Sequence, residues 1–271
     1  MQRTVFFISD GTAITTEKLG HSLLTQFPDV EFRQVRIPFA STEKLVADAV
    51  DQINAAFETD GAPPLVFNSI VNPSLTENLM NSSGIILDLF SAFLEPMAQA
   101  LGVEPKRRVG KAHGMTDRDR YEDRMEATNY ALTHDDGMSL TYTSAELILV
   151  GVSRSGKTPT CLYIGLHFGI KSANYPLTES DLEAQRLPQF LRVHKSRIVG
   201  LLIDPDRLAQ IRETRRPGSK YASLKQTHWE IESAESLLRA EGIPTLYTTH
   251  ASVEEIASRV LMKLDLQRDM F

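Results

Sequence analysis

The segment from Glu146 to Phe168 constrains the fold more than any other part of the chain. It begins with the apolar run 147–150, continues through Gly-Val-Ser-Arg-Ser-Gly-Lys-Thr at 151–158, and ends in a mostly apolar stretch. A strand, a glycine-rich turn and a helix in this order form the phosphate-binding loop G-x-x-x-x-G-K-[ST]. A glycine-rich turn that matches by chance is the alternative. Strand and helix both occur where the motif requires them, so the pattern predicts nucleotide binding.

The residue types of this loop suit an anion. Gly151 and Gly156 permit a tight turn with positive φ, which lets backbone N–H groups converge on a phosphate, and the following helix adds free N–H groups. We expect Lys157 to reach the β- and γ-phosphates and Thr158 to be a Mg²⁺ ligand. The expected nucleotide-binding residues are Gly151, Val152, Ser153, Arg154, Ser155, Gly156, Lys157 and Thr158.

Composition excludes several classes of protein. The net charge of −6 over 271 residues provides no basic field for nucleic acid, so we expect no DNA or RNA partner. No stretch approaches the length of a membrane span, so we expect no membrane partner. The single cysteine, Cys161, cannot form an internal disulfide, which fits a reducing compartment and a cytoplasmic location. We expect Cys161 to be a small buried side chain rather than a reactive thiol.

Strands and helices alternate along the first hundred residues. The patterns predict strands at 4–9, 35–39, 65–71 and 85–87, with helices at 19–27, 45–57, 74–82 and 89–101. Ser41 is the expected cap of the second helix. After the phosphate loop we expect a strand at 198–204, a helix at 226–240, a strand at 245–248, and a last helix capped by Ser252.

This alternation predicts an α/β protein in which a parallel sheet is covered by helices on both faces. We expect an N-terminal parallel-sheet α/β unit at 1–103, a charged helical linker at 104–139, and a P-loop kinase-like α/β unit at 140–271. Ligands of such sheets bind beyond the carboxyl ends of the strands. Asp10 and Asp88 lie at such ends, where a turn and a helix cap explain them equally well.

Carboxylates outside the loop are the candidates for catalysis. Asp204 follows an apolar strand, which is the position of the aspartate that holds Mg²⁺ in phosphate-loop proteins, so we expect it to share the metal with Thr158. His134, Asp135 and Asp136 are further candidates for acid–base chemistry, and a polar turn is their alternative reading. Arg207, Arg212, Arg215 and Arg216 then cluster, either to clamp phosphoryl oxygens or as a solvated helix face.

Several long motifs occur along the chain, at Ile8–Thr15, Pro64–Phe67, His134–Gly137, Gly151–Thr160, Ala173–Pro176, Ile203–Pro205 and Ser219–Leu224. Together they resemble the phosphoenolpyruvate synthase regulatory protein family, and the similarity extends over essentially the whole chain. A sister branch of the family acts on pyruvate, phosphate dikinase, and the Ser9–Thr12 start resembles the synthase branch.

The resemblance implies a bifunctional serine/threonine kinase and pyrophosphorylase. It would inactivate phosphoenolpyruvate synthase by phosphorylating a threonine with ADP as donor, and reactivate it with inorganic phosphate, releasing pyrophosphate. The residues leave the catalytic base open among Asp204, His134, Asp135 and Asp136, with Mg²⁺ expected as a cofactor. A small-molecule kinase using ATP and a non-catalytic nucleotide sensor are the competing functions. A homodimer is a guess from the frequency of two-fold assemblies.

Overall fold

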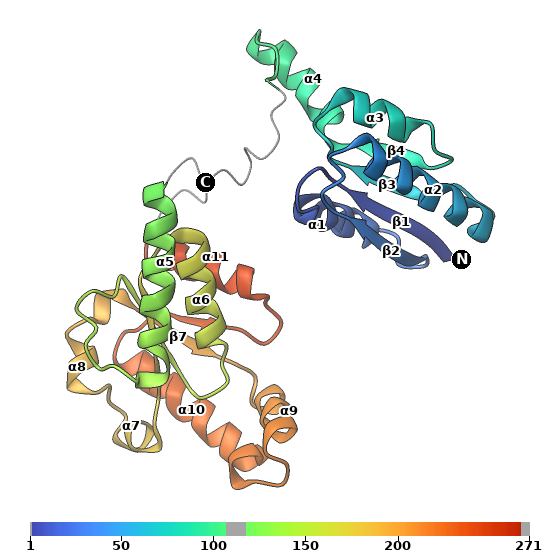
Figure 1. Cartoon of the computed structure of the whole chain (residues 1–271). Helices are drawn as coiled ribbons and strands as arrows, with labels where there is room; N and C mark the ends of the chain where they lie inside the picture. Colours follow the sequence, from blue (N-terminus) through green and yellow to red (C-terminus); the bar gives the residue numbers. More distant parts are fainter. Residues whose placement is uncertain (1, 107–117, 267–271) are drawn as a thin grey trace. The chain divides into compact units, whose positions relative to one another are not determined.

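The computed structural model describes residues 2–106 and 118–266, and the chain divides into two compact units at 1–116 and 117–271. Each unit contains a four-stranded parallel sheet interleaved with helices (Figure 1). The predicted α/β class is therefore confirmed, and it applies to both units.

The first unit has the strand order β2-β1-β3-β4, with every neighbouring pair parallel. Its strands are β1 (Gln2–Ile8), β2 (Glu31–Ile37), β3 (Leu65–Asn68) and β4 (Ile85–Asp88). Its helices are α1 (Ile14–Leu24), α2 (Glu43–Asp60), α3 (Pro73–Met80) and α4 (Leu89–Leu101).

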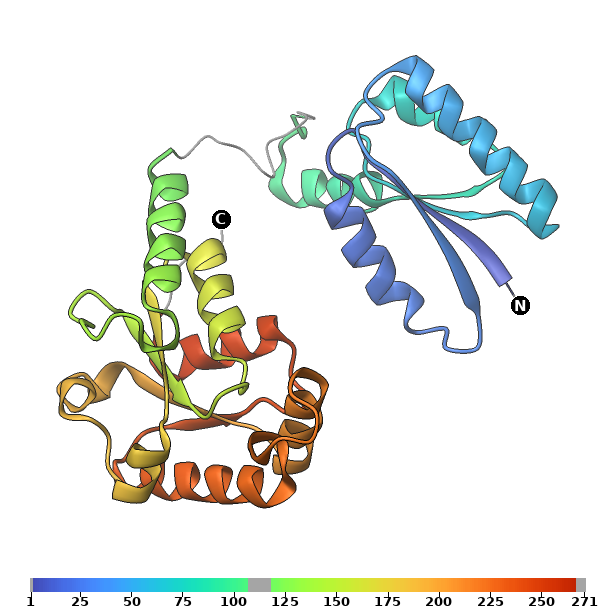
Figure 2. The same ribbon diagram turned by 60° about the horizontal axis from the view of Figure 1, so that its bottom comes forward.

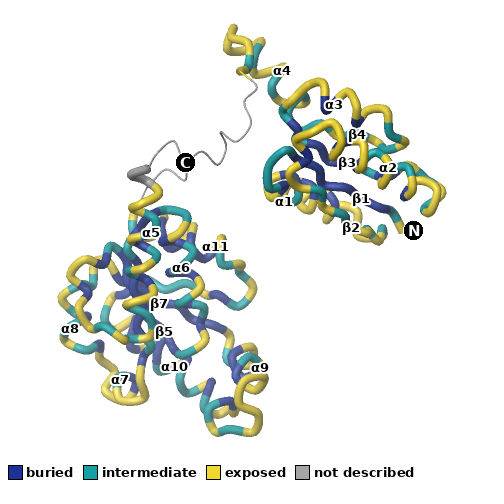
Figure 3. The backbone as a smooth tube through the Cα atoms, in the orientation of Figure 1, coloured by how far each residue is buried: buried dark blue, intermediate teal, exposed yellow. Residues whose placement is uncertain are grey.

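Side chains of β1 point alternately into two apolar layers, because successive strand residues face opposite sides of a sheet. Phe6 and Ile8 pack with residues of α2 and α3, while Val5 and Phe7 pack with Leu24 of α1. Both faces are thereby covered, and the inner strands β1 and β3 are buried from Thr4 to Ile8 and from Val66 to Asn68 (Figure 3).

The second unit repeats this topology with the order β6-β5-β7-β8, again entirely parallel. Its strands are β5 (Leu147–Gly151), β6 (Ser172–Pro176), β7 (Ile198–Leu202) and β8 (Thr245–Tyr247). Its helices are α5 (Arg118–Thr133), α6 (Lys157–Phe168), α7 (Glu179–Ala184), α8 (Gln189–Arg192), α9 (Pro205–Arg215), α10 (Leu224–Ala240) and α11 (Val253–Lys263). Single 3₁₀ turns lie at Asp135–Gly137, Lys195–Arg197 and Lys220–Ala222.

The second sheet also has two apolar faces. One face packs against α10, and the other packs against α6 and α11, as Figure 2 shows. Because β5 lies inside the sheet and the chain leaves it first to β6 and later to β7, the carboxyl end of β5 is a topological switch point. Such points are where parallel α/β sheets bind ligands, and this one carries the glycine-rich loop.

Helix α5 belongs to the second unit, although its residues lie within the segment 104–139 that we expected to be a linker. Ala127 and Ala131 are buried in this helix, and a Cβ at Gly165 of α6 would lie 3.1 Å from the backbone of Ala127 and Thr128. Small residues on both helices allow this close approach. The charged sequence of α5 concealed its buried side, because only a few small side chains form it. Lys106 is described, but residues 107–117 lie outside the described residues.

Some predicted details are wrong. Thr42, rather than Ser41, caps α2, because its hydroxyl accepts from the N–H of Leu45 at 3.3 Å. Phe39 lies beyond the second strand, exposed and with φ of 58°. The strand expected at 198–204 ends at Leu202. The predicted cap Ser252 is confirmed, since its hydroxyl accepts from the N–H of Glu255 at 3.2 Å.

The two strand-end aspartates of the first unit have local structural partners. Asp10 accepts from the N–H of Val71 at 2.8 Å, which ties the turn after β1 to the segment after β3. Asp88 is the N-cap of α4 and accepts from the N–H groups of Phe90 and Ser91. Both contacts are of the local kind, a turn and a helix cap, that the sequence allowed at these positions.

Candidate active site

The loop between β5 and α6 is shaped by three residues with special backbone requirements. Gly156 has φ of 90° and Arg154 has φ of 76°, and both lie in the left-handed region that favours glycine. At Gly151 a Cβ would overlap with the carbonyl oxygen of Leu201. A loop with this backbone conformation directs several N–H groups toward one point, which makes a concavity for an anion.

The loop has two kinds of hydrogen-bond donor that could bind such an anion. The Ser155 hydroxyl is buried and has no hydrogen-bond partner among the residues that the structure describes. The N-cap of α6, Gly156, provides no side-chain hydrogen bond, so the first N–H groups of α6 remain available. A phosphate held here would satisfy both, since phosphate oxygens accept hydrogen bonds readily.

Lys157 is the buried cation of the loop. Its side chain is only 3% exposed, and Nζ donates to the carbonyl oxygen of Val152 at 2.9 Å. Burial lowers the pKa of Lys157 to about 8, while the carboxylates of Asp136 and Asp135 oppose this decrease. A desolvated ammonium group interacts more strongly with a phosphate than a solvated one does, because the surrounding medium screens less.

The 3₁₀ turn at Asp135–Gly137 brings a carboxylate to the loop. Oδ1 of Asp135 accepts from the Thr158 hydroxyl at 2.6 Å and from Nδ2 of Asn174 at 2.6 Å. Asn174 of β6 fixes the turn, because its Oδ1 accepts from the N–H of Asp136 at 3.0 Å and its N–H donates to the carbonyl oxygen of His134 at 3.2 Å. The structure therefore joins Asp135 to Thr158, the residue predicted to be a metal ligand.

His134 is held by groups outside the loop. Nδ1 lies 2.9 Å from the carbonyl oxygen of Tyr130, and Nε2 lies 3.2 Å from that of Thr141. The ring also stacks on Tyr130, with centroids 3.8 Å apart. Through these contacts His134 connects the end of α5 to the segment before β5.

Asp204 lies two residues beyond β7 and caps α9. Its Oδ1 accepts from the N–H of Arg207 at 2.9 Å, and its own N–H donates to the Thr249 hydroxyl at 3.0 Å. Its carboxylate is thus engaged with its own helix, whereas the carboxylate that contacts Thr158 is that of Asp135.

The arginines after Asp204 have different environments. Arg212 is fully buried, and its guanidinium donates to Glu230 at 2.7 and 3.1 Å and to the carbonyl oxygen of Ser153 at 3.0 Å. Arg215 and Arg216 are exposed, at the end of α9. Arg212 therefore holds the loop in place through its hydrogen bond to the carbonyl oxygen of Ser153. The sequence alone groups it with exposed arginines, because its ion-pair partner, Glu230, is 18 positions away.

Tyr221 is a site residue that sequence reasoning left without a role. Its hydroxyl donates to the Ser153 hydroxyl at 2.9 Å, and its ring lies 4.0 Å from the guanidinium carbon of Arg212. The signal was available in the motif Ser219–Leu224, but only the folded chain places that motif beside the loop.

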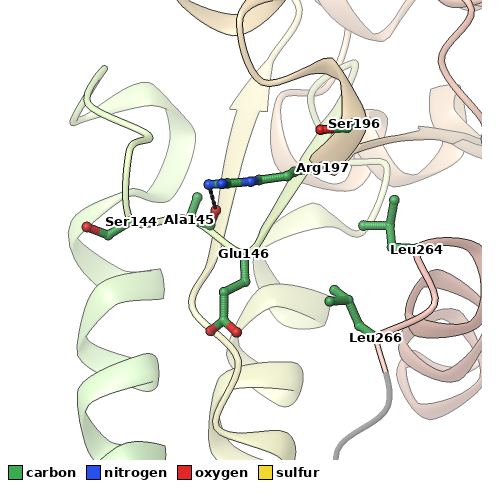
Figure 4. A pocket seen from close by; sticks show the side chains of 7 residues that line it. All are labelled: Ser144, Ala145, Glu146, Ser196, Arg197, Leu264 and Leu266. Carbon is green, nitrogen blue, oxygen red and sulfur yellow. Dashed lines mark hydrogen bonds between the residues drawn. The ribbon is translucent and has the colours of Figure 1, made fainter.

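A separate hollow of about 310 Å³ lies elsewhere in this unit (Figure 4). Its lining includes Ala145 and Glu146, which precede β5, and Arg197, whose Nη1 donates to the carbonyl oxygen of Ala145 at 2.8 Å. It therefore lies at the amino end of β5, opposite the glycine-rich loop. Ligands of parallel sheets bind at the carboxyl ends, so the loop, and not this hollow, is the candidate active site.

Three further observations concern the described part of the chain. Cys161 is buried, and burial raises the pKa of its thiol, as expected for a packing residue. Among the residues described, no three histidine, cysteine, aspartate or glutamate side chains gather as a metal site. No helix within 2–106 or 118–266 has both the length and the apolar character needed to cross a membrane.

A parallel α/β unit with a G-x-x-x-x-G-K-T loop, a buried lysine and a threonine joined to a carboxylate has the features of a phosphotransferase. The chain belongs to the kinase/pyrophosphorylase family, whose model matches residues 5–261. Membership of this family supports phosphotransferase activity.

Similar proteins extend over nearly the whole chain. A protein of Stenotrophomonas maltophilia (strain R551-3), named "Putative phosphoenolpyruvate synthase regulatory protein", is 50% identical over 269 residues, which cover 99% of this chain and 98% of the relative. A protein of the same name from Xanthomonas campestris pv. campestris (strain B100) is 49% identical, with the same coverage. Another, from Hahella chejuensis (strain KCTC 2396), is 49% identical and covers 99% of both chains.

Proposed function

We propose that this protein regulates phosphoenolpyruvate synthase by adding a phosphoryl group to a threonine of that enzyme and by removing it again. ADP is the proposed donor and inorganic phosphate the proposed acceptor in removal. The observation that carries the chemistry is the hydrogen bond between Thr158 and Asp135, beside the buried Lys157. The names of the relatives support the choice of target.

In the forward reaction, the threonine oxygen attacks the β-phosphorus of ADP. The bond between that phosphorus and the oxygen bridging to the α-phosphate breaks, and AMP leaves with the electron pair. The threonine hydroxyl loses its proton. Lys157 and the N–H groups of the loop would bind the phosphoryl oxygens, where charge stabilisation contributes most to phosphoryl transfer.

Removal uses the same bond types in reverse. An oxygen of inorganic phosphate attacks the phosphorus of phosphothreonine, the bond from phosphorus to the threonine oxygen breaks, and pyrophosphate forms. The threonine oxygen regains a proton. Both reactions move a phosphoryl group between a threonine oxygen and a phosphate oxygen, so we assign them to one loop.

The two neighbouring aspartates suit different tasks. Asp135 is already bonded to Thr158 and Asn174, so it is placed to orient Thr158. Asp136 is the next residue of the same 3₁₀ turn, where its N–H donates to Asn174 at 3.0 Å, and its negative charge opposes the lowering of the pKa of Lys157. We assign to Asp136 the transfer of the threonine proton, and to Asp135 the orientation of Thr158.

The Thr158 hydroxyl and the Asp135 carboxylate are hard oxygen donors in contact with each other, which fits Mg²⁺. They are the residues that would hold the ion, together with phosphate oxygens. When bound, Mg²⁺ would neutralise charge on those oxygens.

The test is incubation of the protein with β-labelled ADP and phosphoenolpyruvate synthase. We expect label on a threonine of the synthase and unlabelled AMP in solution. Added inorganic phosphate should inhibit labelling competitively with ADP, and should release label from phosphorylated synthase as pyrophosphate. Label on a small molecule, or labelling that requires γ-labelled ATP instead, would replace the proposal with the small-molecule kinase or with an ATP-dependent protein kinase.

A further inference from the structure

A second pocket, of about 380 Å³, opens directly beside the glycine-rich loop. Its lining includes Ser153 of the loop, Leu177 after β6, Leu182 of α7 and Tyr221, together with Arg212, Gln226 and Glu230. Glu179 and Lys220 lie at its rim, exposed and 3.9 Å apart. This volume is in the range of natural ligand sites, and nothing in the phosphate chemistry of the loop requires it.

The wall of this pocket is rigidly built. Buried Arg212 donates to Glu230, to the carbonyl oxygen of Ser153 and to that of Tyr221, the last at 3.0 Å. Its guanidinium also covers one face of the Tyr221 ring, whose hydroxyl reaches the Ser153 hydroxyl. The positive charge of Arg212 is thereby compensated by Glu230 inside the wall. Because the side chains of this wall are already fixed, little conformational entropy is lost when a ligand binds, and the ligand is held in one defined pose.

The pocket lies at the end of the loop where the terminal phosphoryl group would be bound. In phosphate loops the lysine reaches the last phosphates of the nucleotide. Here Nζ of Lys157 lies 2.9 Å from the carbonyl oxygen of Val152, the residue next to Ser153. A phosphoryl group on Lys157 would therefore lie beside Ser153, at the opening of this pocket. The nucleoside is attached to the other end of the phosphate chain.

The chemistry of the lining selects among ligands. The interior is formed by hydroxyl groups, leucines, an aromatic ring and the Gln226 amide. Arg212 and Glu230 also line it, and they neutralise each other in an ion pair of 2.7 Å. The rim has one negative and one positive side chain. An uncharged chain segment bearing a hydroxyl group fits this lining, with its hydroxyl near Ser153 and Tyr221.

We propose that this pocket binds the phosphoacceptor segment of the protein substrate and presents its threonine hydroxyl to the phosphoryl group on Lys157. The proposal rests on the proposed function, since it requires a protein acceptor. It assigns a role to the motif Ser219–Leu224, which forms the turn carrying Lys220 and Tyr221.

The proposal is tested with substitutions at the rim that narrow the opening of the pocket. Lys220→Trp and Glu179→Trp place a large ring at the opening, and both side chains are exposed, so the fold should be retained. Lys225→Trp is the matched control, because Lys225 is an exposed lysine nearby that does not line the pocket. For each variant we would measure the KM for phosphoenolpyruvate synthase at saturating ADP, and the Kd for ADP by calorimetry.

We expect the two rim variants to raise the KM for the synthase by about tenfold or more, as loss of substrate binding does, with the Kd for ADP unchanged. Lys225→Trp should match the wild type in both. If the wild type transfers label and the rim variants behave like Lys225→Trp, the pocket inference alone is wrong. If they weaken ADP binding instead, the pocket belongs to the nucleoside, which also overturns it. A wild type that labels no protein refutes the proposed function, and the inference with it.

Discussion

At the scale of single residues, Lys157 carries the strongest prediction. Lys157→Ala should lower both phosphorylation and phosphate-dependent removal by about 10²-fold or more, because each reaction loses a cation at the transferred phosphoryl group. Initial rates with β-labelled ADP and with inorganic phosphate measure the two activities. Lys225→Ala is the control for removal of a lysine. A Lys157→Ala protein that keeps either rate would contradict a shared loop.

The buried state of Lys157 also predicts a pH dependence of stability. Its folded-state pKa of about 8 lies below the ordinary 10.5, so the folded protein binds fewer protons than the unfolded chain between these values. The contribution of Lys157 to the free energy of unfolding should therefore increase as the pH rises from about 8 to 10.5, and it should not change with pH below about 8. Urea unfolding of the wild type and Lys157→Met, at several pH values, isolates this contribution. Parallel curves for the two proteins would show that Lys157 titrates normally.

Substitutions of Asp135 and Asp204 test which of the two carboxylates holds Mg²⁺. The sequence pattern suggests Asp204, whereas the structure places Asp135 against Thr158. Asp135→Asn should raise the Mg²⁺ concentration needed for half-maximal activity by about tenfold, because an amide lacks the charge that attracts the ion. Asp204→Asn should leave the Mg²⁺ titration unchanged and cost little stability, since asparagine also caps helices. Activity titrations with Mg²⁺ compare them. The reverse result would restore Asp204 to the metal site.

At the scale of elements, the approach of α5 to α6 determines where Asp135 lies. Gly165→Leu would push a side chain into the backbone of Ala127, so it should lower the free energy of unfolding by about 1–3 kcal/mol, the usual cost of overpacking. Leu166→Ala, at an exposed position of the same helix, is the control and should change it by less than about 0.5 kcal/mol. Urea denaturation measures both.

The same substitution has a catalytic consequence. Asp135 follows α5 by two residues, so moving α5 should separate Asp135 from Thr158. We expect the turnover of Gly165→Leu to fall more than its affinity for inorganic phosphate, which the loop itself binds. Equal losses in both would indicate general destabilisation of the unit.

At the scale of the whole molecule, the two units each have their own apolar layers on both faces of a sheet. A fragment of residues 117–271 should therefore unfold cooperatively in urea. A fragment of residues 140–271, which follows the boundary expected from sequence, should not, because it lacks α5 and exposes the face of α6 at Gly165. Cooperative unfolding of the shorter fragment would show that α5 is dispensable for folding.

The local sequence pattern determined the class of fold, the glycine-rich loop and several helix caps of this protein. The glycine-rich loop, the alternation of strands with helices, the caps at Asp88 and Ser252, and the burial of Cys161 all follow from residues within about one element of each other. Turn chemistry, capping and periodicity act over such short distances, so the sequence expresses them directly.

The tertiary structure decided what depends on strand order. Asp135 meets Thr158 because β6 lies beside β5 and Asn174 fixes the turn, and Arg212 reaches Ser153 across 59 positions. Asp204, which has the expected strand-end position, caps α9, and the carboxylate bonded to Thr158 is that of Asp135. A charged side chain has the same sequence signature whether it is solvated or buried with a distant partner. Only the packing of elements far apart in the chain distinguishes these states, because that packing determines which charges lose water and which groups replace it.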